Sequence, residues 1–300
     1  MVKLLDGKAL SKIIESELKE RIAKVKEKLG FAPKLATILV GENPASKTYV
    51  RMKVKACERV GLGSVEFKLD ENSTTEDVLA IINKLNKNKK VCGILLQHPV
   101  PRQVDEVRCF NAIALEKDVD GVNQTSFGSV ACSKKGFACA TALGMIKILE
   151  HYNIEVEGKH AVVVGRSNIV GKPMAMLLLN KNATVTICHS KTIGLEKILK
   201  KADIVVGAVG RPNFIKAEWL KKGVVLLDAG YNEGNIGDID MENAKLKAKA
   251  YTPVPGGVGP MTIASLMTQT VISAERLAEE NCKVCKQKSF NLFKENCKLK

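Results

Sequence analysis

Residues 161–175, which read AVVVGRSNIVGKPMA, constrain the fold more than any other stretch of this chain. An apolar β-branched run stops at Gly165, a polar turn continues to Gly171, and Pro173 opens an expected helix. A strand, a glycine turn and a helix N-terminus together direct free N–H groups and a positive helix end at one point, which suits a phosphate. Because Ser167 replaces the second glycine of the G-x-G-x-x-G pattern, an ordinary strand-to-helix turn remains the alternative here.

Strands and helices alternate on both sides of this turn, which predicts an α/β fold with parallel sheets. The predicted strands cover 34–40, 65–69, 91–96, a run beginning at 161, 183–188, 203–206 and 224–228. The predicted helices cover 8–29, 44–60 after Asn43 as N-cap, a segment from the Ser73-x-x-Glu76 capping box to 85, 141–151 and 260–280. Between the two series, 118–137 is expected to be rich in loops.

The two series predict two domains with a cleft between them. We expect 1–138 to form an N-terminal parallel-sheet α/β catalytic domain and 139–270 a Rossmann-like dinucleotide-binding domain. Residues 271–300 are expected to form a C-terminal helix that packs back on the N-terminal domain.

Composition favours a soluble protein of the cytoplasm. Hydrophobic residues make up 45% of the 300 residues and charged residues 26%, as in ordinary globular proteins. No apolar run approaches the ~20 residues that span a bilayer, and the N-terminus lacks the features of a signal peptide. Nine cysteines without paired spacing suggest reduced thiols, as in a cytosol.

The formal net charge of +15 has three readings. Nucleic-acid binding is disfavoured because the 47 Lys and Arg are dispersed among 32 acids and aromatic residues make up only 4%. A preference for anionic small molecules or a lysine-rich solvated surface remains. No metal site is expected at Cys282, Cys285 and Cys297, because a structural zinc site needs four ligands and no histidine lies nearby.

The segment after strand 183–188 indicates which dinucleotide the turn would take. An NAD site has an acidic residue about 20 positions past the glycines. Here His189, Ser190, Lys191 and Thr192 follow, without a carboxylate. Together with Arg166 they would accept a 2′-phosphate, which favours NADP over NAD; a solvated strand end is the alternative.

Candidate chemistry lies upstream, at Tyr49 and Lys53. The spacing of four places both on one face of a helix, beside Arg51 and Lys55. A lysine in a partly dry cleft near other cations can have its pKa lowered toward neutrality and transfer protons. A pair on the solvated surface of the helix is the alternative. Short-chain dehydrogenases also have a Tyr-x-x-x-Lys motif, but theirs lies downstream of the glycine turn, whereas Tyr49 and Lys53 lie upstream of it, which disfavours that family.

Three more segments stand out. In GILLQHPVP (93–101), Gln97 lies at the carboxyl end of a strand, where ligands of parallel sheets bind. KDVDG (117–121) places two carboxylates in a tight turn. TPVPGGVGPMT (252–262) is too rich in Pro and Gly for regular structure, and its backbone could close over a ligand.

These segments together resemble the bifunctional methylenetetrahydrofolate dehydrogenase/cyclohydrolase family, in the family's order and from about residue 35 to 270. The matching segments are PASKTYVRMKVKACERVG, GILLQHPVP, KDVDG, VVVGRSNIVGKPMA, ATVTICHSKT, ADIVVGAVGRPNFI and TPVPGGVGPMT.

The resemblance implies a role for each matching residue. Lys53 would be the catalytic residue, with Gln97 supporting it and Tyr49 packing on the folate rings. Asp120 would bind the pterin edge. The loop near substrate and nicotinamide would be Pro255, Gly256 and Gly257. The NADP-binding positions would be Gly165, Arg166, Ser167, Ile169, Val170, Gly171, His189, Ser190, Thr192 and Gly210.

The resemblance also implies two reactions in one-carbon metabolism. The first oxidises 5,10-methylenetetrahydrofolate with NADP⁺, and the second hydrolyses the methenyl product to 10-formyltetrahydrofolate. The partners would be tetrahydrofolate derivatives, polyglutamylated forms among the candidates, and a second copy of the chain bound through the cofactor domain. No nucleic-acid or membrane partner is expected.

The chain departs from the family pattern at four places. Two prolines are absent from CATALG (139–144), which predicts a less rigid linker; Ser126 and Gln269 stand where Asn is usual, and His98 where Leu is usual. Another two-domain NADP oxidoreductase, acting on a shikimate-like or amino-acid substrate, is the enzymatic alternative. A basic nucleic-acid-binding protein is the other.

Overall fold

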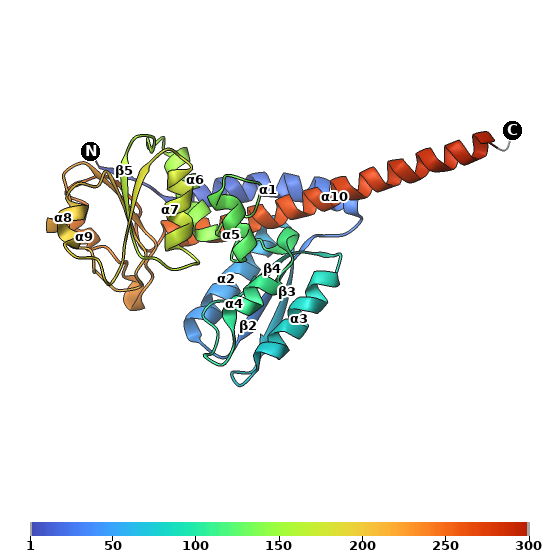
Figure 1. Cartoon of the computed structure of the whole chain (residues 1–300), viewed down its shortest axis with the longest axis horizontal. Helices are drawn as coiled ribbons and strands as arrows, with labels where there is room; N and C mark the ends of the chain where they lie inside the picture. Colours follow the sequence, from blue (N-terminus) through green and yellow to red (C-terminus); the bar gives the residue numbers. More distant parts are fainter. Residues whose placement is uncertain (1, 299–300) are drawn as a thin grey trace.

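The computed structural model describes residues 2–298, with side chains described as far as Cys282, and it confirms the predicted α/β class with two parallel sheets (Figure 1). The smaller sheet has the order β3-β2-β4, with all strands parallel. Its strands are β2 (Lys34–Val40), β3 (Gly63–Leu69) and β4 (Val91–Leu96).

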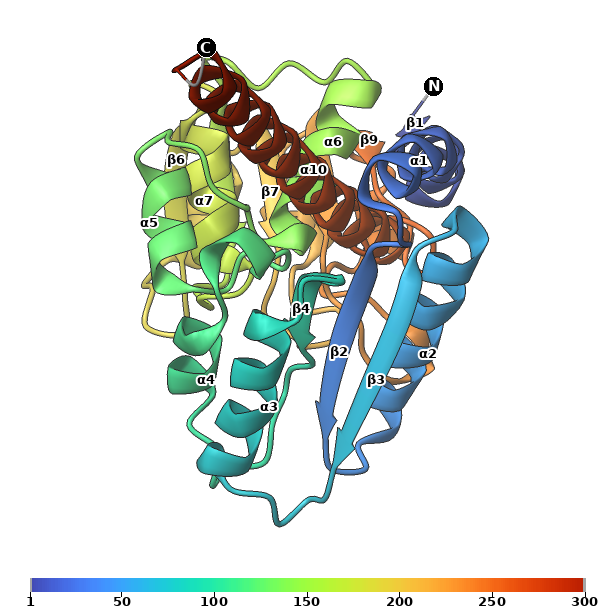
Figure 2. The same ribbon diagram turned by 90° about the vertical axis from the view of Figure 1, so that its right-hand side faces the viewer.

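Helices cover both faces of this smaller sheet, because β2 and β4 are buried on both sides, whereas β3 alternates apolar and polar residues (Figure 2). Leu35 of β2 packs with α2 (Pro44–Val60), whereas the next residue, Ala36, packs with α3 (Thr75–Lys87). Asn43 caps α2, because its side chain accepts a 3.0 Å bond from the Ser46 N–H. The predicted start of α2 is therefore confirmed.

The larger sheet has six parallel strands in the order β1-β9-β8-β7-β5-β6. Its strands are β1 (Lys3–Leu4), β5 (His160–Val164), β6 (Thr184–Cys188), β7 (Ile204–Gly207), β8 (Val224–Asp228) and β9 (Ala248–Tyr251). The connecting helices are α6 (Ala140–His151), α7 (Gly171–Leu179), α8 (Leu195–Leu199) and α9 (Met241–Ala244), with short 3-10 turns η1 (Leu115–Lys117), η2 (Ala217–Trp219) and η3 (Glu233–Asn235). Strand order reverses between β5 and β7, the position at which such sheets bind ligands beyond their carboxyl ends.

Two long helices join the two halves. α10 (Val258–Lys298) leaves the larger sheet and lies beside α1 (Gly7–Leu29), as Figure 1 shows. Arg21 of α1 and Glu275 of α10 form a bidentate ion pair with a shortest distance of 2.7 Å. An apolar cluster continues from these two helices to Leu35 and Leu95 of the smaller sheet.

Several local predictions were wrong. The expected loop-rich stretch contains α5 (Gln124–Ala131), which begins where the Asn123 side chain accepts from the Thr125 N–H, and α4 (Glu106–Ala112) precedes it. The capping box of α3 is formed one residue later than predicted, by Thr74 and Asp77. The strands β1 and β9 were not predicted, because two and four residues carry too little periodicity.

Candidate active site

Lys53 is buried within α2, with 7% of its surface exposed, so it is not a solvated helix-surface residue. Its Nζ donates a 2.8 Å hydrogen bond to Gln97 Oε1. A lysine is almost never this buried without a partner, because its charged head strongly prefers water. The structure thus brings together two residues that lie on separate elements.

Gln97 is held in one orientation by its surroundings. It follows β4 directly, and its backbone N–H donates to the Ile38 carbonyl at 2.8 Å. Its Nε2 donates to the His98 carbonyl at 2.7 Å, which directs Oε1 at Lys53. The side chain of Gln97 is therefore fixed with its oxygen toward Lys53.

Burial controls the acid–base chemistry of this pair. It lowers the pKa of Lys53, and the charge of Asp120 partly offsets that effect. Burial likewise raises the pKa of Asp120 to about 6, against the opposing charges of Lys53 and His98. Lowering the pKa of the amine enlarges its neutral fraction, which is the form that can accept a proton.

The two carboxylates of KDVDG have different surroundings. Asp118 is fully buried and accepts bonds of 3.1 Å from the N–H groups of Val122 and Asn123, so it organises the turn. Burial raises its pKa to about 7. Asp120 is the one whose charge raises the pKa of Lys53 against the effect of burial.

Gln269 of α10 fixes the chain around this turn. Its Oε1 accepts from the Ala138 N–H at 3.0 Å, while its Nε2 donates to the carbonyls of Val119 and Ala138 at 2.7 and 2.8 Å. The thiol of Cys139, the next residue, donates to the Ile169 carbonyl in the glycine turn. The linker that lacks two prolines is thus tied to both halves by side-chain hydrogen bonds.

Tyr49 lies one helical turn before Lys53. Its ring meets that of Tyr231 edge to face, with centroids 5.4 Å apart and planes at 78°. Burial, followed by the charge of Tyr231, raises the pKa of Tyr49 to about 12, so its phenol stays protonated. Tyr231 was not found from the sequence.

In the glycine turn, backbone atoms lie so close to Gly165 and Gly171 that neither position can carry a side chain. A Cβ on Gly165, whose φ is +134°, would lie 2.1 Å from the Ala208 carbonyl oxygen, and one on Gly171 would lie 2.3 Å from the Gly165 oxygen. Ser167 Oγ accepts 3.2 Å bonds from the N–H groups of Val170 and Gly171, so it caps α7. A backbone this compact, ending at a helix N-terminus, fits a dinucleotide phosphate.

The segment after β6 forms a tight turn. The N–H of His189 donates to Thr192 Oγ1 at 2.8 Å, and the Thr192 N–H donates to the His189 carbonyl at 2.8 Å. The Thr192 side chain therefore stabilises the turn, and His189 Nδ1 accepts a 3.2 Å bond from the Lys191 N–H. Ser190, Lys191 and Arg166 are exposed and available to an anionic ligand.

Two buried aspartates that sequence reasoning missed organise the loops at the carboxyl edge. Asp238 is fully buried and accepts from the N–H groups of Val209, Gly210 and Arg211 at 2.6, 3.0 and 2.9 Å. Asp228 accepts from the Gly230, Asp238 and Ile239 amides, and burial raises its pKa to about 6. Two features of the sequence could have indicated them: Asp228 ends an apolar strand, and Gly237-Asp238 follows ten residues later.

The loop containing Pro255, Gly256 and Gly257 is held by the start of α1. The Lys8 N–H donates to the Gly256 carbonyl at 2.8 Å, and Gly7 packs so closely that a Cβ there would lie 1.9 Å from the Gly257 oxygen. The predicted irregular segment ends at Val258, where α10 begins.

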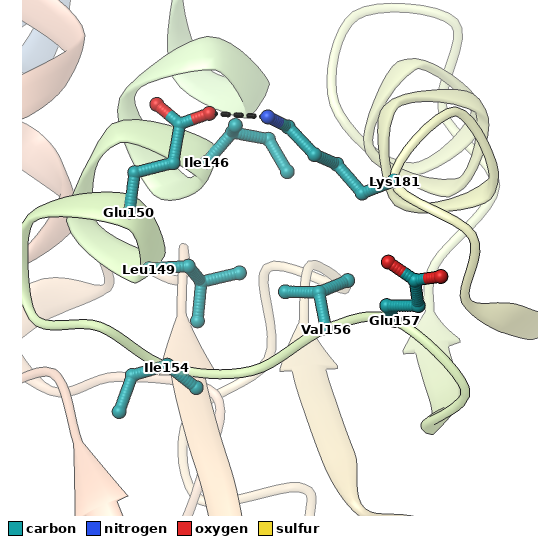
Figure 3. A pocket seen from close by; sticks show the side chains of 7 residues that line it. All are labelled: Ile146, Leu149, Glu150, Ile154, Val156, Glu157 and Lys181. Carbon is teal, nitrogen blue, oxygen red and sulfur yellow. Dashed lines mark hydrogen bonds and ion pairs between the residues drawn. The ribbon is translucent and has the colours of Figure 1, made fainter.

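Two cavities lie away from these residues. One of about 200 Å³ is lined by α6, the segment after it and Lys181, at the amino ends of β5 and β6, and Glu150 pairs with Lys181 across it (Figure 3). The other, of about 590 Å³, lies between α3 and α4. Neither is lined by a predicted site residue, and the first lies at the edge opposite to the carboxyl ends of the strands, where ligands of such sheets bind.

Within residues 2–298, no helix has the length and hydropathy that a bilayer crossing requires. Among the described side chains, no three His, Cys, Asp or Glu are grouped to hold a metal ion. The side chains of Cys285 and Cys297, considered above as zinc ligands, lie outside the described residues.

Comparison with protein families gives two matches that cover most of the chain. Residues 5–120 match the tetrahydrofolate dehydrogenase/cyclohydrolase catalytic domain, and residues 139–278 match the NAD(P)-binding domain of the same enzymes. The chain is 59% identical over 273 residues to bifunctional protein FolD 1 of Colwellia psychrerythraea, covering 91% of this chain and 97% of that protein.

Solved structures agree with this assignment. The bifunctional enzyme FolD of Campylobacter jejuni has a TM-score of 0.89 at 46% identity, covering 92% of this chain and 99% of that one. FolD of Trypanosoma brucei, solved with NADP cofactor and inhibitor, has a TM-score of 0.88 at 33% identity, covering 92% and 98%. The chain belongs to the tetrahydrofolate dehydrogenase/cyclohydrolase family.

Proposed function

We propose that this protein oxidises 5,10-methylenetetrahydrofolate to the 5,10-methenyl form with NADP⁺ and hydrolyses that product to 10-formyltetrahydrofolate. Its family and its relatives named as bifunctional FolD enzymes support both activities. The observation that carries the proposal is the buried Lys53–Gln97 hydrogen bond beside Asp120, on the domain that matches the catalytic family model. Family membership also favours this activity over the shikimate-like oxidoreductase and the nucleic-acid-binding protein considered above.

Lys53 suits the proton transfers of the hydrolysis. Water adds to the methenyl carbon and loses one proton, which gives a neutral carbinolamine. The bond from that carbon to N5 then breaks as N5 gains a proton, while the carbinol O–H loses its proton and becomes the formyl carbonyl. One water is consumed and one proton is released overall. A neutral Lys53 amine can take the proton from water and return it, while Gln97 holds it in place.

NADP⁺, when bound, supplies the acceptor for the hydride that leaves the methylene carbon. The compact turn from Gly165 to Gly171 would hold it, because its closely packed backbone ends at the N-terminus of α7, where a phosphate would bind. The exposed side chains of Arg166 and Ser190 would contact it as well. Tyr49 and Asp120 would orient the folate, and the 255–257 loop would lie near both ligands.

Domain roles follow the same division. Residues 1–138 would bind folate and 139–270 the cofactor. Of the expected C-terminal helix 271–300, Val271 and Ala274 pack against the first domain, whereas the end of α10 extends away from both domains (Figure 1). We further propose that the enzyme works as a homodimer in the cytoplasm and accepts polyglutamylated folates, as the family resemblance implies.

The direct test supplies 5,10-methylenetetrahydrofolate and NADP⁺ and follows the methenyl absorbance and the 10-formyl product. Both should form only when enzyme and NADP⁺ are present. Absence of methenyl formation with either NADP⁺ or NAD⁺ would refute the oxidation step.

Replacing Arg166 with alanine is expected to raise KM for NADP⁺ about tenfold, the loss typical of one charge-assisted phosphate contact. NAD⁺ lacks the 2′-phosphate, so its KM should stay within about twofold and serves as the internal control. Steady-state kinetics with both cofactors checks this. Equal kcat/KM for NADP⁺ and NAD⁺ in the unmodified enzyme would contradict the 2′-phosphate argument.

Replacing Asp120 with asparagine is expected to move the acid limb of the kcat–pH profile of methenyl hydrolysis to lower pH. An ionised carboxylate raises the pKa of Lys53, so its loss lowers that pKa further and the neutral amine persists in more acidic solution. Because the pKa of Asp120 is about 6, the two profiles should differ above about pH 6 and converge below it. A basic limb that moves to lower pH, in place of the shifted acid limb, would show that the lysine acts as the ammonium.

A further inference from the structure

Tyr231 joins the two domains at the candidate site. It lies just after β8 in the larger sheet, yet its ring packs edge to face on Tyr49 of α2, which belongs to the smaller sheet's half of the molecule. The centroids are 5.4 Å apart, and 49% of the Tyr231 surface is exposed. An aromatic ring this open does not serve as core, because core aromatics are enclosed on all sides.

The backbone around Tyr231 is fixed on both sides. The Gly230 N–H donates to Asp228 Oδ1 at 2.9 Å, and the Asn232 N–H donates to the Ile236 carbonyl at 2.9 Å. Gly230 also packs against Asp238 so tightly that a Cβ would lie 2.3 Å from its Oδ1. A half-exposed ring on a rigid backbone is the arrangement by which proteins pre-organise ligand contacts.

Asp238 connects this loop with the cofactor side of the cleft. The same carboxylate accepts from the N–H groups of Val209, Gly210 and Arg211 and, at 3.3 Å, from Asn232 Nδ2. The 209–211 segment follows β7, next to Ala208, whose carbonyl contacts Gly165 of the glycine turn. A shift of either loop must therefore move the other.

We propose that Tyr231 is a folate-positioning residue supplied by the cofactor domain, and that it couples cofactor binding to folate binding. Its ring stands nearly perpendicular to that of Tyr49, so the two rings form an aromatic corner against which the fused rings of the substrate would pack, one helical turn from Lys53. The edge-to-face geometry fixes the plane of Tyr49, and Asp238 relays the state of the 209–211 loop to Tyr231. This inference rests on the proposed folate activity.

Three variants test the role in turnover. Tyr231→Ala should raise KM for 5,10-methylenetetrahydrofolate about tenfold and leave kcat within about twofold, because an aromatic contact is lost but Lys53 and Gln97 are untouched. Tyr231→Phe, which keeps the ring, should behave like the unmodified enzyme. Ile236→Ala is the matched control, since Ile236 is an exposed residue of the same loop. A KM for folate unchanged in Tyr231→Ala would overturn the proposal.

Calorimetric titration with tetrahydrofolate, with and without saturating NADP⁺, tests the coupling and does not depend on turnover. NADP⁺ should tighten tetrahydrofolate binding several-fold in the unmodified enzyme, and Tyr231→Ala should abolish that difference. Equal coupling in both proteins would refute the relay. The two proposals can fail separately. If the unmodified enzyme bound tetrahydrofolate but formed no methenyl product from 5,10-methylenetetrahydrofolate, the proposed function would be refuted. The titration would still show whether Tyr231 couples the two binding sites.

Discussion

Lys53→Ala is expected to abolish methenyl hydrolysis, with a loss of at least about a hundredfold in kcat, the lower end of what a positioned acid–base group contributes. The ammonium or amine of Lys53 is the group that Gln97 Oε1 holds at 2.8 Å, and burial lowers its pKa toward the range in which it can exchange protons. The oxidation should also slow, because the same lysine helps orient the folate. Loss of the methenyl absorbance measures the hydrolysis.

The fold of this variant should survive. Taking a lysine out of the interior removes a desolvation cost together with one hydrogen bond, so the two effects partly cancel. Lys55→Ala is the matched control, because Lys55 is exposed on the same helix. Near-normal hydrolysis in Lys53→Ala, with an unchanged circular dichroism spectrum, would remove Lys53 from the catalytic role.

Gly171→Ala is expected to weaken NADP⁺ binding by at least about tenfold. The new Cβ would lie 2.3 Å from the Gly165 oxygen and 2.9 Å from the Arg166 nitrogen, and both are backbone atoms that cannot rotate away. The phosphate-binding turn must therefore shift. Fluorescence titration with NADPH measures the affinity, and the melting temperature should fall by several degrees, as expected for ~1–3 kcal/mol of overpacking.

Gly128→Ala provides the comparison for Gly171→Ala. Gly128 lies within α5, and a Cβ there meets nothing within 4 Å. Alanine favours a helix over glycine by up to ~1 kcal/mol, so this control should be neutral or stabilising. Methenyl hydrolysis requires no hydride acceptor and should survive Gly171→Ala better than the oxidation does. An unchanged affinity for NADPH would show that the turn does not hold the phosphate.

The parts of the fold that the sequence predicted are those with strong local signals. The helix from Pro44 combines an N-cap, a first-turn proline and a terminal glycine, and the strands over 34–40 and 91–96 are continuous apolar runs. Tyr49 and Lys53 could be placed on one helical face from their spacing alone. Their role, however, came from the resemblance to a family, because nothing local distinguishes a buried i, i+4 pair from a solvated one.

What the sequence did not predict depends on contacts between distant segments. Asp238 meets the 209–211 amides only once the larger sheet has formed, and Tyr231 meets Tyr49 only once the two sheets are placed together. The short helix α5 contains Gly128 and only a few apolar residues, so its pattern is weak, and its N-cap Asn123 is also typical of turns. The role of Asp118 is likewise set by burial, which no local pattern reveals.

The pairing of β1 with β9 has a consequence for how the chain acquires its structure during synthesis. Lys3 pairs with Ala250, so the first strand leaves the ribosome about 250 residues before the strand that receives it. Strand β1 therefore cannot join the larger sheet until β9, near the end of the chain, has been synthesised. Because the start of α1 also holds the Gly256 carbonyl, the finished active site depends on a segment that must wait unpaired through most of translation.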